Sequence, residues 1–204
     1  MLQNFSLPAL AFAALALAGC AAPEAGHDHG QADGAKAPTM GMMGGRMGGM
    51  GGGMMRGRMA VASLTPTQGN DVRGLVMFHQ MDGQLMVHAK ISGLKALGEH
   101  GFHVHETGSC ASTDGTSAGS HFNPDAKPHG PQHAAHHAGD LPALKADANG
   151  VADQKFMLTG PTVTAGPASV VGRAVVVHAL PDDYATQPTG NSGARIACGV
   201  IAAH

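Results

Sequence analysis

The feature that most limits the fold is a strict alternation of side chains between residues 84 and 91. The run reads Gln84, Leu85, Met86, Val87, His88, Ala89, Lys90 and Ile91. Every second residue is aliphatic, and successive side chains of a strand point to opposite faces of the sheet. The run therefore predicts a half-buried β-strand.

Further strand signals follow the same logic. We expect strands at Asp71–Gln80, Gly101–Glu106, Gly150–Leu158, Arg173–Val177 and Ala194–Ile201. The link Met81-Asp82-Gly83 is a hairpin signal between the first two strands. No stretch has a helical period, and 31 glycines, 12 prolines, one tyrosine and no tryptophan suit short strands and loops. The sequence predicts an all-β antiparallel sandwich or barrel over residues 60–204.

Two long segments carry little strand signal. They are Thr107–Leu144 and Ala179–Gly193, and loops of this length in a compact domain are usually functional. We expect the first to be a metal-binding loop and the second an active-site loop.

The N-terminus resembles an export signal. Leu7–Ala18 is apolar but too short to span a bilayer as a mature helix, and it leads into Leu17-Ala18-Gly19-Cys20. Small residues before a cysteine resemble the bacterial lipoprotein signal, although residues 1–8 contain no Lys or Arg. The resemblance implies a signal peptide at 1–19 and a lipidated Cys20. A plain secretory signal is the alternative, and both imply export.

The residue after the cysteine is Ala21, and in this the sequence resembles lipoproteins that are transported to the outer membrane. We therefore expect a periplasmic protein attached to the outer membrane through Cys20. Residues 20–59 have the composition of a flexible tether, with His27-Asp28-His29 and eight methionines between Met40 and Met59. Thioether and imidazole groups both bind copper. The segment is either a copper-gathering arm or a spacer of biased composition.

The cysteine count agrees with an oxidising compartment. With Cys20 lipidated, Cys110 and Cys198 remain, and an even pair in an exported protein indicates one disulfide. Such a bond would stabilise the fold by roughly 4–5 kcal/mol in the chain-entropy model. Two free structural thiols are the alternative.

The histidines fall into three sets, the first of which is His103-Val104-His105, whose two imidazoles share one face of a strand. The second set is His121, His129, His137 and Asp140, in the pattern H-x7-H-x7-H-x2-D. Three imidazoles and one carboxylate are a tetrahedral set suited to zinc. His178 ends an apolar strand, and with His103 and His105 it supplies three imidazoles for copper.

Other histidines compete for these roles. His133 and His136 lie in the same loop as His137, so either of them is an alternative to His137 as a ligand. We expect His79 and His88 to be solvated strand positions and His204 to be a free tail.

The motifs resemble the copper–zinc superoxide dismutase family. They are Gly101-Phe102-His103-Val104-His105-Glu106, His121-Phe122-Asn123-Pro124, His129-Gly130, His137-Ala138-Gly139-Asp140 and Ala197-Cys198-Gly199-Val200-Ile201. The resemblance runs from about Ala60 to the C-terminus. It implies an immunoglobulin-like Greek-key fold of about eight strands, with one copper ion and one zinc ion per domain.

The resemblance also implies residue roles. Copper would be held by His103, His105, His121 and His178, and zinc by His121, His129, His137 and Asp140. Asp182 would link His129 to His103, Arg195 would draw in the anion, Cys110 and Cys198 would form the family's disulfide, and His100 would be structural.

The implied activity is dismutation of superoxide to dioxygen and hydrogen peroxide, with Arg195 and His121 as the catalytic residues. The alternative is an envelope copper carrier or buffer on the same fold. A net charge of −2 gives no indication of a nucleic-acid partner. The sequence leaves a monomer and a homodimer equally open.

Overall fold

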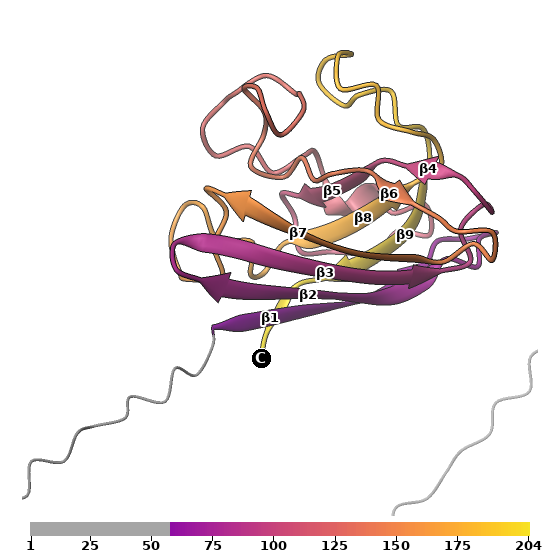
Figure 1. Ribbon diagram of the computed structural model, residues 1–204, viewed down its shortest axis with the longest axis horizontal. Coiled ribbons are helices and arrows are strands. Elements are labelled where there is room, and N and C mark those ends of the chain that lie inside the picture. Colours follow the sequence, from indigo (N-terminus) through magenta and orange to yellow (C-terminus); the bar gives the residue numbers. More distant parts are fainter. Residues whose placement is uncertain (1–57) are drawn as a thin grey trace, which may run out of the picture. The chain divides into compact units, whose positions relative to one another are not determined.

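The computed structural model of the chain describes residues 58–204 (Figure 1). The expected signal peptide, Cys20 and the tether up to residue 57 lie outside the described residues. Within the described part, no helix is long and apolar enough to cross a membrane.

The described chain is almost entirely strand and loop. Its elements are β1 (Met59–Pro66), β2 (Arg73–Met81), β3 (Gln84–Ser92), β4 (Glu99–His100), β5 (Phe102–His105), the 3-10 turn η1 (Thr116–Ala118), β6 (Leu144–Lys145), β7 (Ala152–Thr159), β8 (Ala174–His178), β9 (Arg195–Val200) and β10 (Ala202–Ala203). Each expected strand is present within a few residues of its predicted bounds. The strand β1 was not expected, because two of its three inward residues, Ala60 and Ala62, are small and give a weak pattern.

The strands form one curled antiparallel sheet in the order β5-β8-β9-β1-β2-β3-β7, with β10 on β1. Strands β1, β2, β3 and β7 lie side by side as one layer, and β5, β8 and β9 form the other (Figure 1). β7 pairs with β3, whereas β9 pairs with β1 and β8 lies between β5 and β9, so distant segments become neighbours as in a Greek key. The predicted all-β sandwich is confirmed.

The core lies between the two layers. Leu85, Val87, Ala89 and Ile91 of β3 are buried while their neighbours point outward, as the alternation predicted. Phe102 and Val104 of β5 supply part of the opposite face of this core. The layers thus pack through the inward residue of each alternating pair.

The outer face of β8 is also covered. All five residues of β8 are buried, and Val176 packs in a second cluster with Ala118, Cys198 and Cys110. The two long loops therefore lie over the β5–β8–β9 layer, and the histidines of β5 project into the space beneath them.

Candidate metal centre

Two adjacent strands and one loop bring the predicted histidines together. His103 and His105 lie two residues apart on β5, and β5 pairs with β8, which ends at His178. The loop is held to β5 by isolated bridges that join His105 to His121 and His103 to Asp140. Backbone pairing with β5 therefore fixes the loop ligands in place.

The first group consists of buried imidazoles. One ring nitrogen from each of four residues lies within 4.8 Å of the others: His103, His105, His121 and His178. His105 Nδ1 donates to the carbonyl oxygen of Gly119 at 2.9 Å, and His178 Nδ1 donates to that of Gly193 at 3.1 Å. A carbonyl oxygen can only accept, so each Nε2 presents a lone pair. These two Nε2 atoms face each other at 3.3 Å, an arrangement that a shared cation would stabilise.

Burial keeps three members of this group neutral. It lowers the pKa of His103 to about 4, that of His105 to about 2 and that of His178 to about 3, and neighbouring imidazoles add to the effect. Neutral imidazole is the form that binds a metal ion. His103, His105 and His178 are therefore ready to coordinate at neutral pH without first losing a proton.

The second group converges on one carboxylate oxygen. Asp140 Oδ1 lies 3.0 Å from Nδ1 of His121, 3.0 Å from Nδ1 of His129 and 3.2 Å from Nδ1 of His137. Its other oxygen accepts the backbone N–H groups of Gly130 and His137. Burial opposes ionisation of Asp140, but the facing imidazoles outweigh it and hold its pKa well below the usual range.

Unpartnered nitrogens show that the two groups fit metal ions. His103 Nδ1 and His121 Nε2 in the first group are buried without a hydrogen-bond partner. So is His129 Nδ1 in the second group, whose 3.0 Å contact with Asp140 is a charge contact and not an aligned hydrogen bond. Outside the two groups, His100 Nε2 is in the same state. A buried polar atom left in that state costs about 1–3 kcal/mol. An all-imidazole set suits copper, and three imidazoles with one carboxylate suit zinc. His121 belongs to both groups: its Nδ1 lies 3.0 Å from Asp140 Oδ1, and its Nε2 is buried without a hydrogen-bond partner.

Asp182 connects the two groups from outside. Its Oδ2 accepts from His103 Nε2 at 2.6 Å, and its Oδ1 accepts from His129 Nε2 at 2.9 Å. Both imidazoles thus carry a proton on Nε2 and offer Nδ1 to a metal. Burial disfavours protonation of His129, but Asp140 and Asp182 outweigh it and raise its pKa to about 9, so a metal ion at Nδ1 would have to displace the proton held there at neutral pH. His103, His129 and Asp182 also have the donor types that hold a metal ion. The atoms through which they face each other are, however, already joined by the two hydrogen bonds to Asp182.

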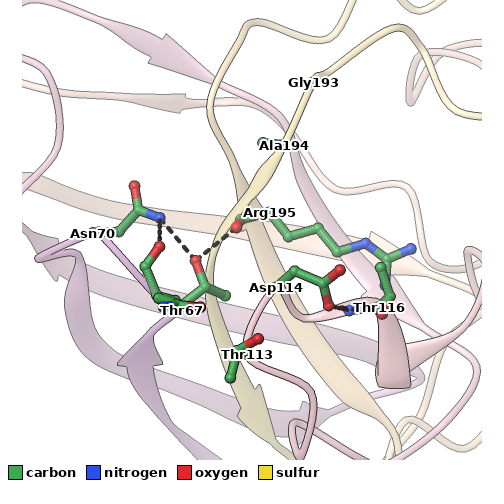
Figure 2. A pocket seen from close by; sticks show the side chains of 9 residues that line it. Thr67, Asn70, Thr113, Asp114, Thr116, Gly193, Ala194 and Arg195 are labelled. Carbon is green, nitrogen blue, oxygen red and sulfur yellow. Dashed lines mark hydrogen bonds between the residues drawn. The ribbon is translucent and has the colours of Figure 1, made fainter. Parts of the chain in front are cut away.

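Arg195 stands at the entrance to the first group. Its guanidinium donates to the carbonyl oxygens of Gly115 and Gly119, each at 2.7 Å. With His105, His121 and His178 it lines a cavity of about 340 Å³. On its other side, Arg195 lines a polar hollow with Thr67, Asn70 and Asp114 (Figure 2). A positive charge therefore lies on the path by which an anion reaches the imidazoles.

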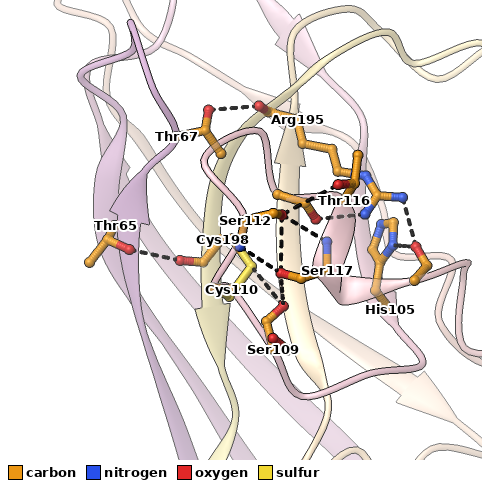
Figure 3. The surroundings of a disulfide bond; sticks show 12 residues. Thr65, Thr67, His105, Ser109, Cys110, Ser112, Thr116, Ser117, Arg195 and Cys198 are labelled. Atoms are coloured by element: carbon orange, nitrogen blue, oxygen red, sulfur yellow. Dashed lines mark hydrogen bonds between the residues drawn. A yellow bond between two sulfur atoms is a disulfide. The ribbon is translucent and has the colours of Figure 1, made fainter.

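The predicted disulfide is confirmed between Cys110 and Cys198, whose Cα atoms are 5.8 Å apart. It attaches the first long loop to β9 (Figure 3). Ser117 lies beside it, bonded to Ser112 and to the carbonyl oxygen of Ser109. The cross-link thus holds the segment that carries Gly115 and Gly119.

Other predicted positions lie apart from the two groups. His133 is exposed, and His136 Nδ1 contacts the carbonyl oxygen of Ala134 at 2.7 Å, so neither belongs to a metal group. His100 is buried and contacts the carbonyl oxygen of His178 through Nδ1 at 2.8 Å, as a structural histidine would.

Sequence reasoning missed three glycines at the site. Gly115 and Gly119 anchor Arg195 through their carbonyl oxygens, with φ of 77° and 75°. Gly190 packs on the Asp182–His129 link, where an added Cβ would lie 2.4 Å from His129 Nε2. The sequence shows only that each of these positions in the long loops is a glycine. The positive φ and the close contacts that require glycine there become visible only in the folded structure.

Comparisons with known proteins agree with this geometry. Residues 72–201 match the family model described as copper/zinc superoxide dismutase. An extracellular Cu-Zn superoxide dismutase of Drosophila melanogaster is 43% identical over 148 residues, which are 67% of this chain and 80% of the relative.

A solved structure is similar as well. The crystal structure of a double mutant of a SOD-like protein from Bacillus subtilis superposes with a TM-score of 0.63 at 37% identity. The match covers 68% of this chain and 94% of that one. With both metal groups, the fold and the family match in agreement, the chain belongs to the copper–zinc superoxide dismutase family.

Proposed function

We propose that this chain dismutates superoxide in the cell envelope at a copper site formed by His103, His105, His121 and His178. The zinc site is formed by His121, His129, His137 and Asp140. The observation that carries the assignment is that His121 belongs to both groups, with Nδ1 at 3.0 Å from Asp140 and Nε2 unpartnered in the first group.

Copper, when bound, takes an electron from one superoxide and gives it to a second, so that dioxygen and, after uptake of two protons, hydrogen peroxide are formed. His121 would hold both ions, one at each ring nitrogen, and this would require the ring to lose both N–H protons. Two flanking cations make that loss accessible at neutral pH. The Nε2 atom of His121, which would face the copper ion, is placed to hold and deliver one of the two protons.

The remaining side chains prepare the site. Arg195 attracts and orients the anion at the mouth of the 340 Å³ cavity. Asp182 fixes the rings of His103 and His129 through their Nε2–H groups. Zinc at the second group orders a loop segment that has few apolar side chains of its own.

The residue assignment is tested in the full chain reconstituted with copper and zinc. His137→Gln should lose zinc, whereas His133→Gln, a loop histidine outside both groups, should keep both metals and full turnover. Equal metal loss in the two variants would contradict the zinc assignment. Stoichiometric copper with no turnover in the unaltered chain would favour the carrier alternative.

The envelope location rests on the N-terminal sequence. We infer a signal peptide at 1–19, a lipidated Cys20 and a tether over 20–59, ahead of a domain at 60–204. The extracellular location of the Drosophila melanogaster relative supports export. Metabolic labelling with a radioactive fatty acid should mark the unaltered chain and not Cys20→Ser; label on both proteins would contradict lipidation at Cys20.

The tether is also proposed to gather copper through its methionines and His27-Asp28-His29. Deleting residues 21–55 should slow copper loading of the zinc-bound chain when copper is scarce, because the arm raises local copper concentration. Unchanged loading kinetics would identify the segment as a spacer.

A further inference from the structure

All five methionines between residues 58 and 204 lie on one face of one layer. They are Met59 on β1, Met77 and Met81 on β2, Met86 on β3, and Met157 on β7. Their chain neighbours Ala60, Phe78, Leu85 and Leu158 point into the core, so the methionines point outward. Not one methionine of the described range is buried, although methionine ordinarily fills gaps in cores. Core packing therefore does not explain where the thioethers lie.

The strand register places His79 at the centre of these thioethers. His79 of β2 pairs directly with Met59 of β1 on one side and with Met86 of β3 on the other. Side chains opposite one another on the same face have Cβ atoms about 4.5–5.5 Å apart. Met77 and Met81 flank His79 along its own strand, two residues away and on the same face.

The row continues on both sides. Met86 pairs with Met157 of β7, which is 45% exposed. At the other end, the backbone N–H of His204 donates to the carbonyl oxygen of Met59 at 2.9 Å. The row thus crosses the adjacent strands β1, β2, β3 and β7 seen in Figure 1, with the imidazole of His79 among the sulfurs.

We propose that this outer face binds one Cu(I) ion, with the imidazole of His79 and the thioethers of Met59 and Met86 as ligands. Thioether and imidazole are soft ligands that select Cu(I), and the row contains no carboxylate that would favour a harder cation. His79 and its two cross-strand partners are each half-buried, so an ion among them is partly shielded from water.

This site is separate from the dismutase centre. The imidazoles of the centre lie on the outer side of β5 and β8, and the hydrophobic core lies between that layer and the methionine face. Met59 is also the last of the eight methionines in residues 40–59. The sheet site therefore follows directly in sequence from the methionine-rich segment.

The test uses the full chain loaded with zinc and with copper in the Cu(I) state, its disulfide intact and its methionine methyl groups labelled with carbon-13. Under anaerobic conditions, Cu(I) is added in excess of what the N-terminal segment holds, and the methyl resonances are followed by NMR. Signals of Met59 and Met86 should shift together and saturate, as should the ring signals of His79. Unmoved signals at saturating Cu(I) would overturn the site.

Matched variants distinguish Cu(I) binding from contact of another protein molecule with this apolar face. The double variant Met59→Leu/Met86→Leu keeps volume and apolarity but removes sulfur, so Cu(I) binding at His79 should weaken at least about tenfold. His79→Gln should do the same, whereas His88→Gln should not, because His88 already pairs with Asp153 at 2.7 Å. Equal Cu(I) affinity in the two histidine variants would contradict the assignment. Shifts of the methyl NMR signals that do not require copper, grow with protein concentration and persist in the leucine variant would identify a contact between protein molecules. This result would also overturn the proposed Cu(I) site.

Discussion

Arg195 and His105 donate to the same backbone oxygen. The guanidinium of Arg195 donates to the carbonyl of Gly119 at 2.7 Å, and His105 Nδ1 donates to it at 2.9 Å. One peptide group therefore positions the cation that we propose attracts superoxide and sets the tautomer of a proposed copper ligand. Arg195 and His105 therefore both depend on the position of this one carbonyl oxygen.

The role of Arg195 predicts a loss of rate without loss of metal. Arg195→Ala should lower superoxide turnover about tenfold, because electrostatic guidance of an anion raises its encounter rate by at least that factor. Arg195→Lys should retain part of the rate, since it keeps the charge but not the two-carbonyl geometry. Elemental analysis should find copper unchanged in both; copper loss from the alanine variant would contradict the assignment.

The bridge made by Asp182 predicts weakened binding of both metals. In Asp182→Asn, one of the two imidazole N–H groups faces an amide N–H in place of an oxygen, so metal affinity should fall about 10–100-fold. Competition with a chelator measures this change. The neighbouring Asp183→Asn is the control, because the side chain of Asp183 is exposed and accepts hydrogen bonds only from Ala185 and Thr186 in its own turn. Equal losses in both variants would show that the linkage through Asp182 has no special role.

The close approach of Gly190 predicts a steric effect on the same linkage. A Cβ there would lie 2.0 Å from Asp182 Oδ1, so Gly190→Ala must displace the carboxylate and weaken zinc binding. Gly69→Ala provides the control for backbone strain, since Gly69 has a φ of 80° but nothing within 4 Å of its added Cβ. Zinc content measured after dialysis should fall only in the Gly190 variant. The same loss in both would mean that strain, and not contact with Asp182, is responsible.

The disulfide predicts a loss of both stability and rate. Replacing Cys110 and Cys198 together by serine should lower the free energy of unfolding by about 4 kcal/mol in the chain-entropy model, because the bond closes a long loop. It also releases the segment whose carbonyl oxygens anchor Arg195. Denaturant unfolding and turnover at a temperature where the variant remains folded measure the two effects. Unchanged turnover would show that the anchoring does not depend on the cross-link.

Much of the fold could be predicted because its pattern is local. The alternation of Leu85 and Val87 with outward residues is visible in any eight-residue window, and the hairpin at Asp82-Gly83 follows from turn chemistry. β1 was missed because alanine gives little hydrophobic contrast. The order of the strands depends on contacts between distant segments, such as β3 with β7, which the local pattern does not contain.

The candidate site shows a similar division. Its ligand types and their spacing are encoded in side chains, so the histidines and Asp140 could be named from the sequence. The carbonyl oxygens of Gly115, Gly119 and Gly193 could not, because every residue has one and only the folded loop decides which oxygen faces an imidazole or guanidinium. The methionine face was missed for the related reason that its residues come from four strands.

The most direct test of the account is superoxide turnover by the full chain reconstituted with one copper and one zinc ion. We expect copper-dependent turnover that falls as ionic strength rises, because the anion is guided by Arg195. His121→Ala should abolish it by breaking both metal groups at once. A chain that holds both ions and shows no turnover above the copper-free protein would contradict the proposed function.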